Sequence, residues 1–239
     1  EETLKLITPR TRLLILNSPA NPTGGVTPKT EVDRLVAGLE KWPDVAVMSD
    51  EIYDHMVYDG ETHVCLLSYP SIRDRLILLN GWSKTYAMTG WRIGYAGAPD
   101  NLIKAMDMVQ GQQTSGACSI AQWAAVEALN GPQDFIKVSR KAFEERRDLV
   151  VSMLNQAKYI KCPNPEGAFY VYPDCSAAIG KKTQKGKVIS SDEDFIGELL
   201  EQEGVAVVHG TLKNPKGRLE SFLGEVGRKG KQAKFGSVR

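Results

Sequence analysis

Residues 75–84 read Arg-Leu-Ile-Leu-Leu-Asn-Gly-Trp-Ser-Lys, and this stretch decides the fold. A short apolar run that ends in polar residues is typical of a buried strand. Two earlier stretches, at residues 12–17 and 45–49, have the same form, and residues 28–42 between them carry apolar side chains at helical spacing. Strands that alternate with helices predict parallel βαβ units, and therefore an α/β fold with a mainly parallel sheet and flanking helices.

The rest of the chain predicts a second, smaller domain. A further strand at 92–98 and two helices, at 99–113 and 119–129, extend the first domain. A long helix at 133–156 leads into a region that mixes strands with a helix, so we expect a small α+β domain. In that region the sequence predicts a strand at 167–172, a capping box of Ser190 and Glu193 that opens a helix to Glu203, and a strand at 204–208.

We place the boundary between the two domains near residue 138. The large domain then spans residues 1–138, and the small domain spans residues 139–239. From about residue 211 the chain is rich in Gly, Lys and Arg and shows no steady period. Such a composition is typical of an exposed loop or an insert without regular structure, so the small domain is expected to be incomplete and to carry an irregular tail.

Composition excludes several classes of function. The chain has 239 residues and a formal net charge of +1, which argues against a nucleic-acid partner or an anionic membrane surface. No apolar run reaches the roughly 18 residues that a membrane span requires. The four cysteines and three histidines are scattered, so we expect no metal site and no disulfide framework. Four free thiols fit a reducing cytoplasm.

Polar residues follow each predicted strand at the point where it ends. Asn21 follows the first strand, Asp50 and Tyr53 follow the second, and Lys84 follows the third. These ends are about 30 residues apart, which suits one βαβ step each. Ligand sites in open α/β sheets lie at the carboxyl ends of the strands. We therefore expect these four side chains to converge on one edge of the sheet.

An amine, a carboxylate, a phenol and an amide match the requirements of pyridoxal 5'-phosphate chemistry. Lys84 can condense with the cofactor's aldehyde, and a carboxylate such as Asp50 keeps the pyridine nitrogen protonated, so that the ring withdraws electrons. Asn21 and Tyr53 can donate to the ring hydroxyl oxygen, and the guanidinium of Arg92 suits the phosphate.

Each of these residues also has a purely structural interpretation. Lys84 could be a solvated charge, Asp50 a helix cap and Tyr53 a packed aromatic side chain. Likewise, Asn21 could be a turn residue and Arg92 a partner in a surface ion pair. Their common order and spacing favour the functional interpretation.

Three motifs resemble the class I aminotransferases of pyridoxal-phosphate fold type I. They are Asn-Pro-Thr-Gly from Asn21, Asp-Glu-Ile-Tyr from Asp50, and Ser-Lys-x-x-Ala-Met-x-Gly-x-Arg-Ile-Gly from Ser83. The resemblance covers most of the chain up to His209, and it is strongest to the bacterial branch of aspartate and prephenate aminotransferases. It implies that the chain is the C-terminal part of the large domain followed by the small domain.

The resemblance also implies a role for each motif residue. Lys84 would be the Schiff-base lysine and Asp50 the partner of the pyridine nitrogen, with Tyr53 at the ring hydroxyl. Asn21 would contact both the ring hydroxyl and the substrate α-carboxylate, and its bond to Pro22 is a candidate cis peptide. Arg92 would bind the phosphate, with Ser83 as a further phosphate contact.

The family's arginine for the substrate α-carboxylate has no clear counterpart. Arg239, in the segment Ala-Lys-Phe-Gly-Ser-Val-Arg, has the family's local pattern but lies further from Gly210 than the family places it. Arg218 is at a better distance with a poorer pattern. A third possibility is that neither residue takes this role. We favour Arg239.

The resemblance implies further that this chain is a fragment. Members of the family carry an N-terminal portion that has no counterpart here, and they work as homodimers. A sheet interrupted in its middle exposes an edge and an apolar face, so we expect the isolated chain to be poorly soluble or inactive.

The expected function is amino transfer between an amino acid, with aspartate or glutamate favoured, and a 2-oxo acid. Prephenate is the next candidate substrate. Another reaction on the same cofactor, such as β-elimination, is an enzymatic alternative. A ligand sensor built on the aminotransferase fold is the non-enzymatic alternative.

Overall fold

The described part of the chain, residues 2–210 and 221–222, divides into two compact units in a computed structural model. The first unit comprises residues 1–20 and 25–138, and the second comprises residues 21–24 and 139–239. The division at residue 138 falls inside a long helix, α5 (Asp134–Gln156). The segment Asn21–Gly24 belongs to the second unit, although the chain on either side of it belongs to the first.

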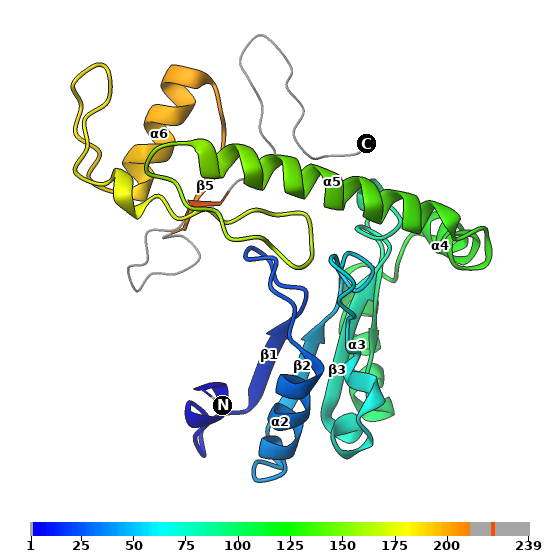
Figure 1. The fold of residues 1–239 in the computed structure, drawn as a ribbon. Helices are drawn as coiled ribbons and strands as arrows, with labels where there is room; N and C mark the ends of the chain where they lie inside the picture. Colours follow the sequence, from blue (N-terminus) through cyan, green and yellow to red (C-terminus); the bar gives the residue numbers. More distant parts are fainter. Residues whose placement is uncertain (1, 211–220, 223–239) are drawn as a thin grey trace. The chain divides into compact units, whose positions relative to one another are not determined.

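A four-stranded sheet forms the centre of the first unit (Figure 1). Its strands lie in chain order, and they are β1 (Leu13–Asn17), β2 (Ala46–Asp50), β3 (Leu76–Gly81) and β4 (Gly94–Gly97). The first three are parallel, as the sequence predicts, and β4 runs antiparallel to β3. The α/β fold class with a mainly parallel sheet is therefore confirmed.

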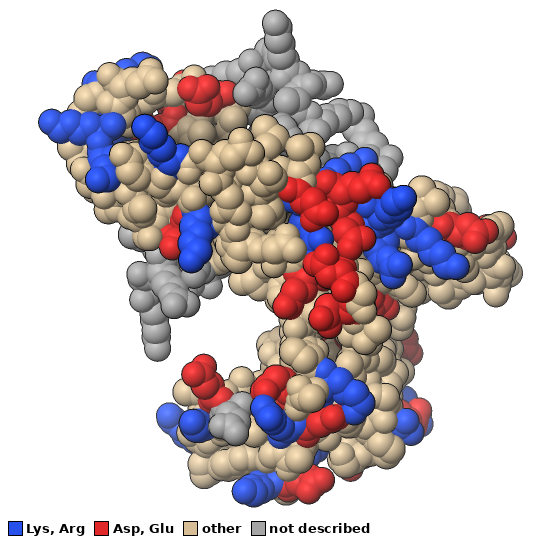
Figure 2. Space-filling model, in the orientation of Figure 1, with Lys and Arg blue, Asp and Glu red and all other residues tan. Residues whose placement is uncertain are grey.

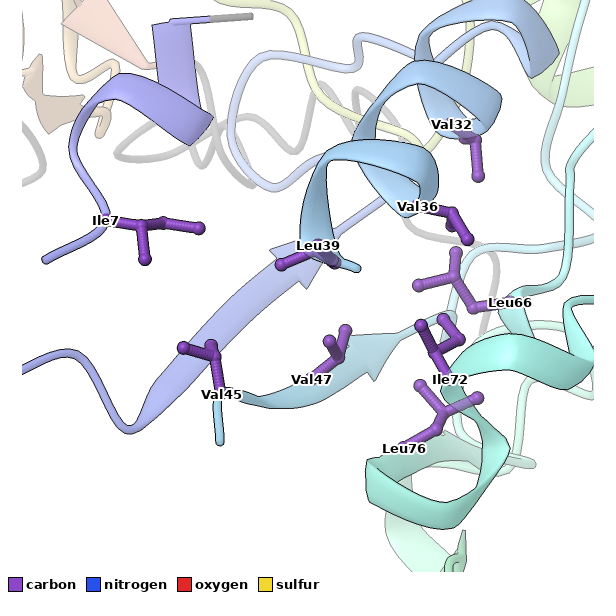
Figure 3. Close-up of a cluster of buried hydrophobic side chains, with 9 residues drawn as sticks. All are labelled: Ile7, Val32, Val36, Leu39, Val45, Val47, Leu66, Ile72 and Leu76. Atoms are coloured by element: carbon purple, nitrogen blue, oxygen red, sulfur yellow. The ribbon is translucent and has the colours of Figure 1, made fainter. Parts of the chain in front are cut away.

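Helix α2 (Lys29–Leu39) covers one face of this sheet. Its buried residues Val32, Val36 and Leu39 recur at the spacing that places them on one side of a helix. They pack against Val47 of β2 and other apolar side chains in one cluster, which Figure 3 shows. This packing fixes the strand ends, where the polar residues of the site follow.

The connection between β2 and β3 differs from the prediction. The spacing suggests a helical crossover, but the structure has two short 3₁₀ helices, η1 (Leu66–Ser68) and η2 (Pro70–Arg75). Pro70 lacks a backbone N–H and clashes with a preceding turn, so a continuous α-helix cannot run through this position. A third 3₁₀ helix, η3 (Thr89–Trp91), precedes β4.

The first unit contains α3 (Asp100–Gln113) and α4 (Ser119–Asn130) near the predicted positions. It also contains a short helix that the sequence did not predict, α1 (Glu2–Lys5). Ala121 and Ala125 of α4 pack on Trp82 and Ile93 in a second apolar cluster. Trp82 of this cluster immediately precedes Ser83 and Lys84, so the cluster supports the loop that carries them.

The second unit contains most of α5, the helix α6 (Asp192–Glu203), a 3₁₀ helix η4 (Ser176–Ala178) and an antiparallel pair of short strands. That pair is β5 (Val208–His209) and β6 (Ser221–Phe222). The structure has no continuous strand at 167–172, where Gly167 and Val171 each take part in an isolated β-bridge. Ala168 has a φ of 57°, which interrupts the extended conformation.

Charged side chains of both signs lie on the face drawn in Figure 2. On the face drawn in Figure 2, the lysine and arginine side chains lie in separate groups with acidic side chains nearby. Within the described ranges, no helix is both long and apolar enough to cross a membrane.

Candidate active site

Asp50 lies at the carboxyl end of β2, directly opposite Asn17 of β1. The Asn17 side-chain amide donates to the Asp50 carbonyl over 3.1 Å. The Asp50 side chain is half-buried, and its Oδ1 accepts the backbone N–H of Ile52 over 3.2 Å. No other group in the described residues donates to this carboxylate, so Oδ2 is available to an incoming donor.

The surroundings of Asp50 raise its pKa. Burial is the largest cause, because it disfavours the charged form, and the hydrogen bond from Ile52 offsets part of this effect. The neighbouring carboxylate of Glu51 raises the pKa further. A positively charged partner at Oδ2 would reverse this change, so Asp50 is well suited to bind a cationic donor.

Tyr53 and Lys84 follow the ends of β2 and β3 and lie near each other. Tyr53 is almost fully buried, with 3% of its surface exposed, in the turn after β2. The Lys84 Nζ lies 5.9 Å from the centre of the Tyr53 ring. Since β2 and β3 are parallel neighbours, the ends that carry Asp50 and Lys84 lie on the same edge of the sheet.

Asp54 links the three segments that form this edge. It accepts Asn80 Nδ2 from the end of β3 over 2.8 Å and Thr85 Oγ1 from the lysine loop over 3.4 Å. The sequence analysis did not identify Asp54 as a site residue. Its acidic side chain after Tyr53 has no distinguishing spacing, and only the fold shows which polar groups it meets.

Ser83 and Arg92 lie on one short loop. The Ser83 carbonyl accepts Thr89 Oγ1 over 2.9 Å, and Arg92 Nη1 donates to the Thr89 carbonyl over 2.9 Å. Arg92 is exposed, and its backbone is left-handed with a φ of 52°. A non-glycine residue in this region costs about 1–3 kcal/mol, and such conformations cluster at functional sites.

Asn21 lies in the second unit, in a segment that packs on residues 165–170. Its bond to Pro22 is cis, as the sequence suggests, and so is the bond between Ser18 and Pro19. Asn21 Nδ2 donates to the Tyr170 hydroxyl over 3.4 Å. The convergence of Asn21 with Asp50 and Lys84 stays a prediction. Tyr170 is a partner that the sequence analysis missed.

The segment Asn21–Gly24 requires glycine at its last position. Its φ is 71°, and its carbonyl accepts the N–H of Gly167 over 2.7 Å. A Cβ on Gly24 would lie 2.4 Å from the Cβ of Pro165 and 2.8 Å from the Gly167 carbonyl oxygen. Only glycine fits this close approach of two segments of the chain.

The remaining predictions concern the substrate-binding arginine, the cysteines and a metal site. Arg239 and Arg218, the two candidates for the substrate carboxylate, lie outside the described residues. Within the part of the chain that the structure describes, the four cysteines form no disulfide, and no group of three metal-binding side chains occurs.

The family model described as aminotransferase class I and II matches residues 1–219. The chain belongs to this family. A relative from Rhizobium leguminosarum bv. phaseoli, named "Probable aspartate/prephenate aminotransferase", is 62% identical over 208 residues, which are 87% of this chain and 52% of the relative.

Two solved aminotransferases have the same fold. The aspartate aminotransferase of Rhizobium meliloti superposes with a TM-score of 0.88 and 46% identity, over 93% of this chain and 55% of that one. The aspartate aminotransferase of Thermus thermophilus with maleate superposes with a TM-score of 0.77 and 39% identity, over 87% of this chain and 51% of that one. This aminotransferase chain thus spans about half the length of the curated relatives it matches.

Proposed function

We propose that this chain carries the cofactor-binding and catalytic residues of a pyridoxal-phosphate-dependent aminotransferase. The observation that supports the proposal most directly is the Asp50 carboxylate. It is half-buried, its pKa is raised by burial, and its Oδ2 accepts no hydrogen bond from the described residues. It lies at the same sheet edge as the amine of Lys84.

These residues fit the cofactor. A protonated pyridine nitrogen would supply both the donor and the positive charge that Asp50 Oδ2 can accept. Pyridoxal phosphate, when bound, supplies the electron-withdrawing ring that stabilises a carbanion at the substrate α-carbon. The buried phenol of Tyr53, close to Lys84, suits the ring hydroxyl.

Each residue of the chain then has a defined task. Lys84 would hold the cofactor through Nζ, and its free amine would move a proton to and from the substrate α-carbon. Tyr53 and Asn21 orient the ring by hydrogen bonds to its hydroxyl oxygen. Ser83 and Arg92 bind the phosphate, and the guanidinium of Arg92 suits this task because it presents several donors in one plane.

The substrates that we favour are aspartate or glutamate with a 2-oxo acid. Two relatives named aspartate aminotransferase or aspartate/prephenate aminotransferase support this choice, and one neighbour was solved with maleate, which is a dicarboxylate. We assign the α-carboxylate to Asn21 and Arg239. Prephenate is the second candidate, because the Rhizobium leguminosarum relative carries it in its name.

The same proposal includes the oligomeric state and the cellular compartment of the protein. We expect a homodimer, in keeping with the family resemblance of the motifs. We also expect a cytoplasmic protein, which the four cysteines outside disulfides support because disulfides persist in oxidising compartments.

Covalent capture of the cofactor tests the proposal. The chain is mixed with one equivalent of pyridoxal phosphate, reduced with borohydride and digested, and the modified peptide is identified by mass spectrometry. We expect modification at Lys84 in the wild type and its loss in Lys84→Ala. Lys104→Ala, which removes an exposed lysine of α3, is the control and should leave the modification in place.

Product analysis with aspartate and 2-oxoglutarate tests the reaction itself. In the longer protein that the family resemblance implies, formation of glutamate and oxaloacetate is expected, and loss of proton transfer in Lys84→Ala should lower the rate by about 10²–10⁴-fold. Consumption of aspartate without glutamate would favour the elimination alternative. Capture spread over surface lysines, with none at Lys84, would contradict the proposed cofactor site.

A further inference from the structure

Glu51, the residue after Asp50, has no task in the proposed reaction, yet it is one of the most buried charged residues. Only 2% of its surface is exposed. Its Oε1 accepts Ser49 Oγ over 2.8 Å and the backbone N–H of Leu66 over 2.9 Å, while its Oε2 lies 2.8 Å from Nε2 of His63. Buried carboxylates persist only where such hydrogen bonds replace water.

His63, the partner of Glu51, is also a largely buried polar side chain. Its side chain is about nine-tenths buried, and its Nδ1 has no hydrogen-bond partner among the described residues. Glu51 is therefore the group that holds the imidazole in place. His63 and Ser49 also line a small cavity of about 30 Å³. A space of this size can hold a water molecule that would satisfy Nδ1.

The backbone couples this buried pair to Asp50. The Glu51 N–H donates to the Leu79 carbonyl over 2.9 Å, which continues the ladder between β2 and β3 past Asp50. Successive side chains of an extended strand point to opposite faces. When the Glu51 carboxylate is anchored in the interior, the direction of the Asp50 carboxylate is fixed as well.

We propose that Glu51 and His63 are a positioning pair that orients the Asp50 carboxylate toward the ring nitrogen of the cofactor and places a second negative charge behind it. This inference rests on the proposed function. Neither residue touches the cofactor or the substrate in this proposal, so both act through Asp50.

The electrostatics of the pair support a retained charge. Burial alone raises the pKa of Glu51, but the hydrogen bonds from His63, the Leu66 N–H, Cys65 and Ser49 outweigh it and lower that pKa. The Cys65 thiol beside it stays neutral, because burial and the nearby carboxylates raise its pKa to about 11. The Glu51 charge in turn raises the pKa of Asp50.

A merely structural role makes a different prediction. If Glu51 only anchors the segment of His63 to Leu66, its loss lowers stability without changing the titration of Asp50. If it also acts by charge, the Asp50 titration moves. Glu51→Gln separates these cases. The glutamine side chain has the same shape and can still form hydrogen bonds through its oxygen and its NH₂ group, but it carries no charge.

The first measurement needs no cofactor. The Asp50 carboxyl is followed by ¹³C NMR over pH in the full chain and is assigned by its absence in Asp50→Asn. We expect the Asp50 midpoint to move to lower pH in Glu51→Gln and to stay in place in Glu61→Gln, which neutralises an exposed carboxylate in the following loop. An equal midpoint in the wild type and Glu51→Gln overturns the charge role.

The second measurement uses pyridoxal phosphate. We expect a dissociation constant on the order of tenfold higher for Glu51→Gln and His63→Leu. The pH midpoint of the cofactor's visible absorbance should also fall in Glu51→Gln, because loss of a negative charge disfavours protonated forms. His63→Gln keeps a donor toward Glu51 and should restore binding to within about threefold of the wild type.

The outcomes distinguish this inference from the proposed function. If Lys84 never captures the cofactor, the proposed function fails, whereas the Asp50 titration still decides whether Glu51 acts on it. If Glu51→Gln does not fold, the comparison of His63→Leu with His63→Gln decides instead. Equal cofactor binding by those two variants overturns the positioning pair.

Discussion

The partly buried carboxylate of Asp50 destabilises the folded chain, and its proposed task explains why it is there. Burial raises its pKa, so the folded state binds this proton more tightly than the unfolded chain does. As pH rises from the ordinary value of 3.8 through the folded pKa, stability is therefore lost. A carboxylate that awaits a cationic partner destabilises the chain without that partner at neutral pH.

We predict that Asp50→Asn stabilises the chain at pH 7 while it weakens cofactor binding. The amide oxygen can keep the bond from Ile52, and the buried charge is removed. The gain in the free energy of unfolding is about 0.5 kcal/mol, because water screens this half-exposed group. Urea denaturation at pH 7 and at pH 3.5 measures it.

The pH dependence provides the check on this prediction. The difference between Asp50→Asn and the wild type should shrink at pH 3.5, where the wild-type carboxyl is protonated too. Asp44→Asn, at an exposed carboxyl before β2, is the control and should leave stability unchanged. A destabilised Asp50→Asn at pH 7 would show that the carboxylate makes favourable contacts in the chain itself.

At the scale of elements, the close approach of Gly24 to residues 165–167 predicts a sharp requirement for glycine. Gly24→Ala forces a non-glycine residue into a positive φ, at about 1–2 kcal/mol. The overlap of the new Cβ with Pro165 and Gly167 adds about 1–3 kcal/mol. The loss in the free energy of unfolding is measured by urea denaturation.

Gly60 provides a matched control for Gly24. Its φ is 76°, close to that of Gly24, but a Cβ there meets nothing within 4 Å. Gly60→Ala should therefore lose only the conformational part, about 1–2 kcal/mol. Equal losses for the two variants would mean that the contact between the Asn21–Gly24 segment and residues 165–167 has no energetic weight.

The start of α6 gives a second prediction for an element. The sequence suggests a capping box of Ser190 and Glu193, but the structure shows Ser191 as the cap, with its Oγ accepting the Asp194 N–H over 3.1 Å. Ser191→Ala should cost about 1 kcal/mol, whereas Ser191→Gly should cost only a few tenths. Thermal denaturation of both variants checks the assignment, and a neutral Ser191→Ala would contradict it.

Regular elements were predictable where local pattern and packing agree. Strands β1, β2 and β3 and helix α2 follow from apolar runs and helical spacing, because their side chains fill one shared core. The direction of β4 was not predictable, since its residues are compatible with either orientation. Residues 167–172 have strand composition but form no continuous strand, because Ala168 has a positive φ that interrupts the extended conformation, and local β-propensity does not reveal this.

The candidate site was predictable in its residue types but not in its contacts. The identities of Asp50, Tyr53 and Lys84 and their places after the strands indicate a sheet edge with cofactor chemistry. Contacts that cross the chain, such as Asp54 with Asn80 or Glu51 with His63, leave no periodic signal in the sequence. They depend on which loops the fold brings together, so only the structure could supply them.

At the scale of the whole molecule, the apolar surface of the first unit predicts self-association. Leu14 and Leu16 of β1 pack on the core under α2, while Leu13 and Ile15 face the other way and are 41% and 63% exposed. Among the described strands, β1 pairs only with β2, so β1 is an edge strand of this sheet. A net charge of +1 offers little electrostatic repulsion against association.

We predict that the purified chain forms dimers or larger species at micromolar concentration, as size-exclusion chromatography with light scattering would show. Ile15→Lys places a charge on the exposed face of β1 and should shift the chain toward monomer. Trp123→Lys, at a residue of α4 that is 75% exposed, tests the helical surface separately. If only Trp123→Lys reduces association, the helices rather than the strand drive it. A wild-type chain that stays monomeric throughout contradicts the prediction, because an uncovered apolar sheet face of this kind should not remain in water at that concentration.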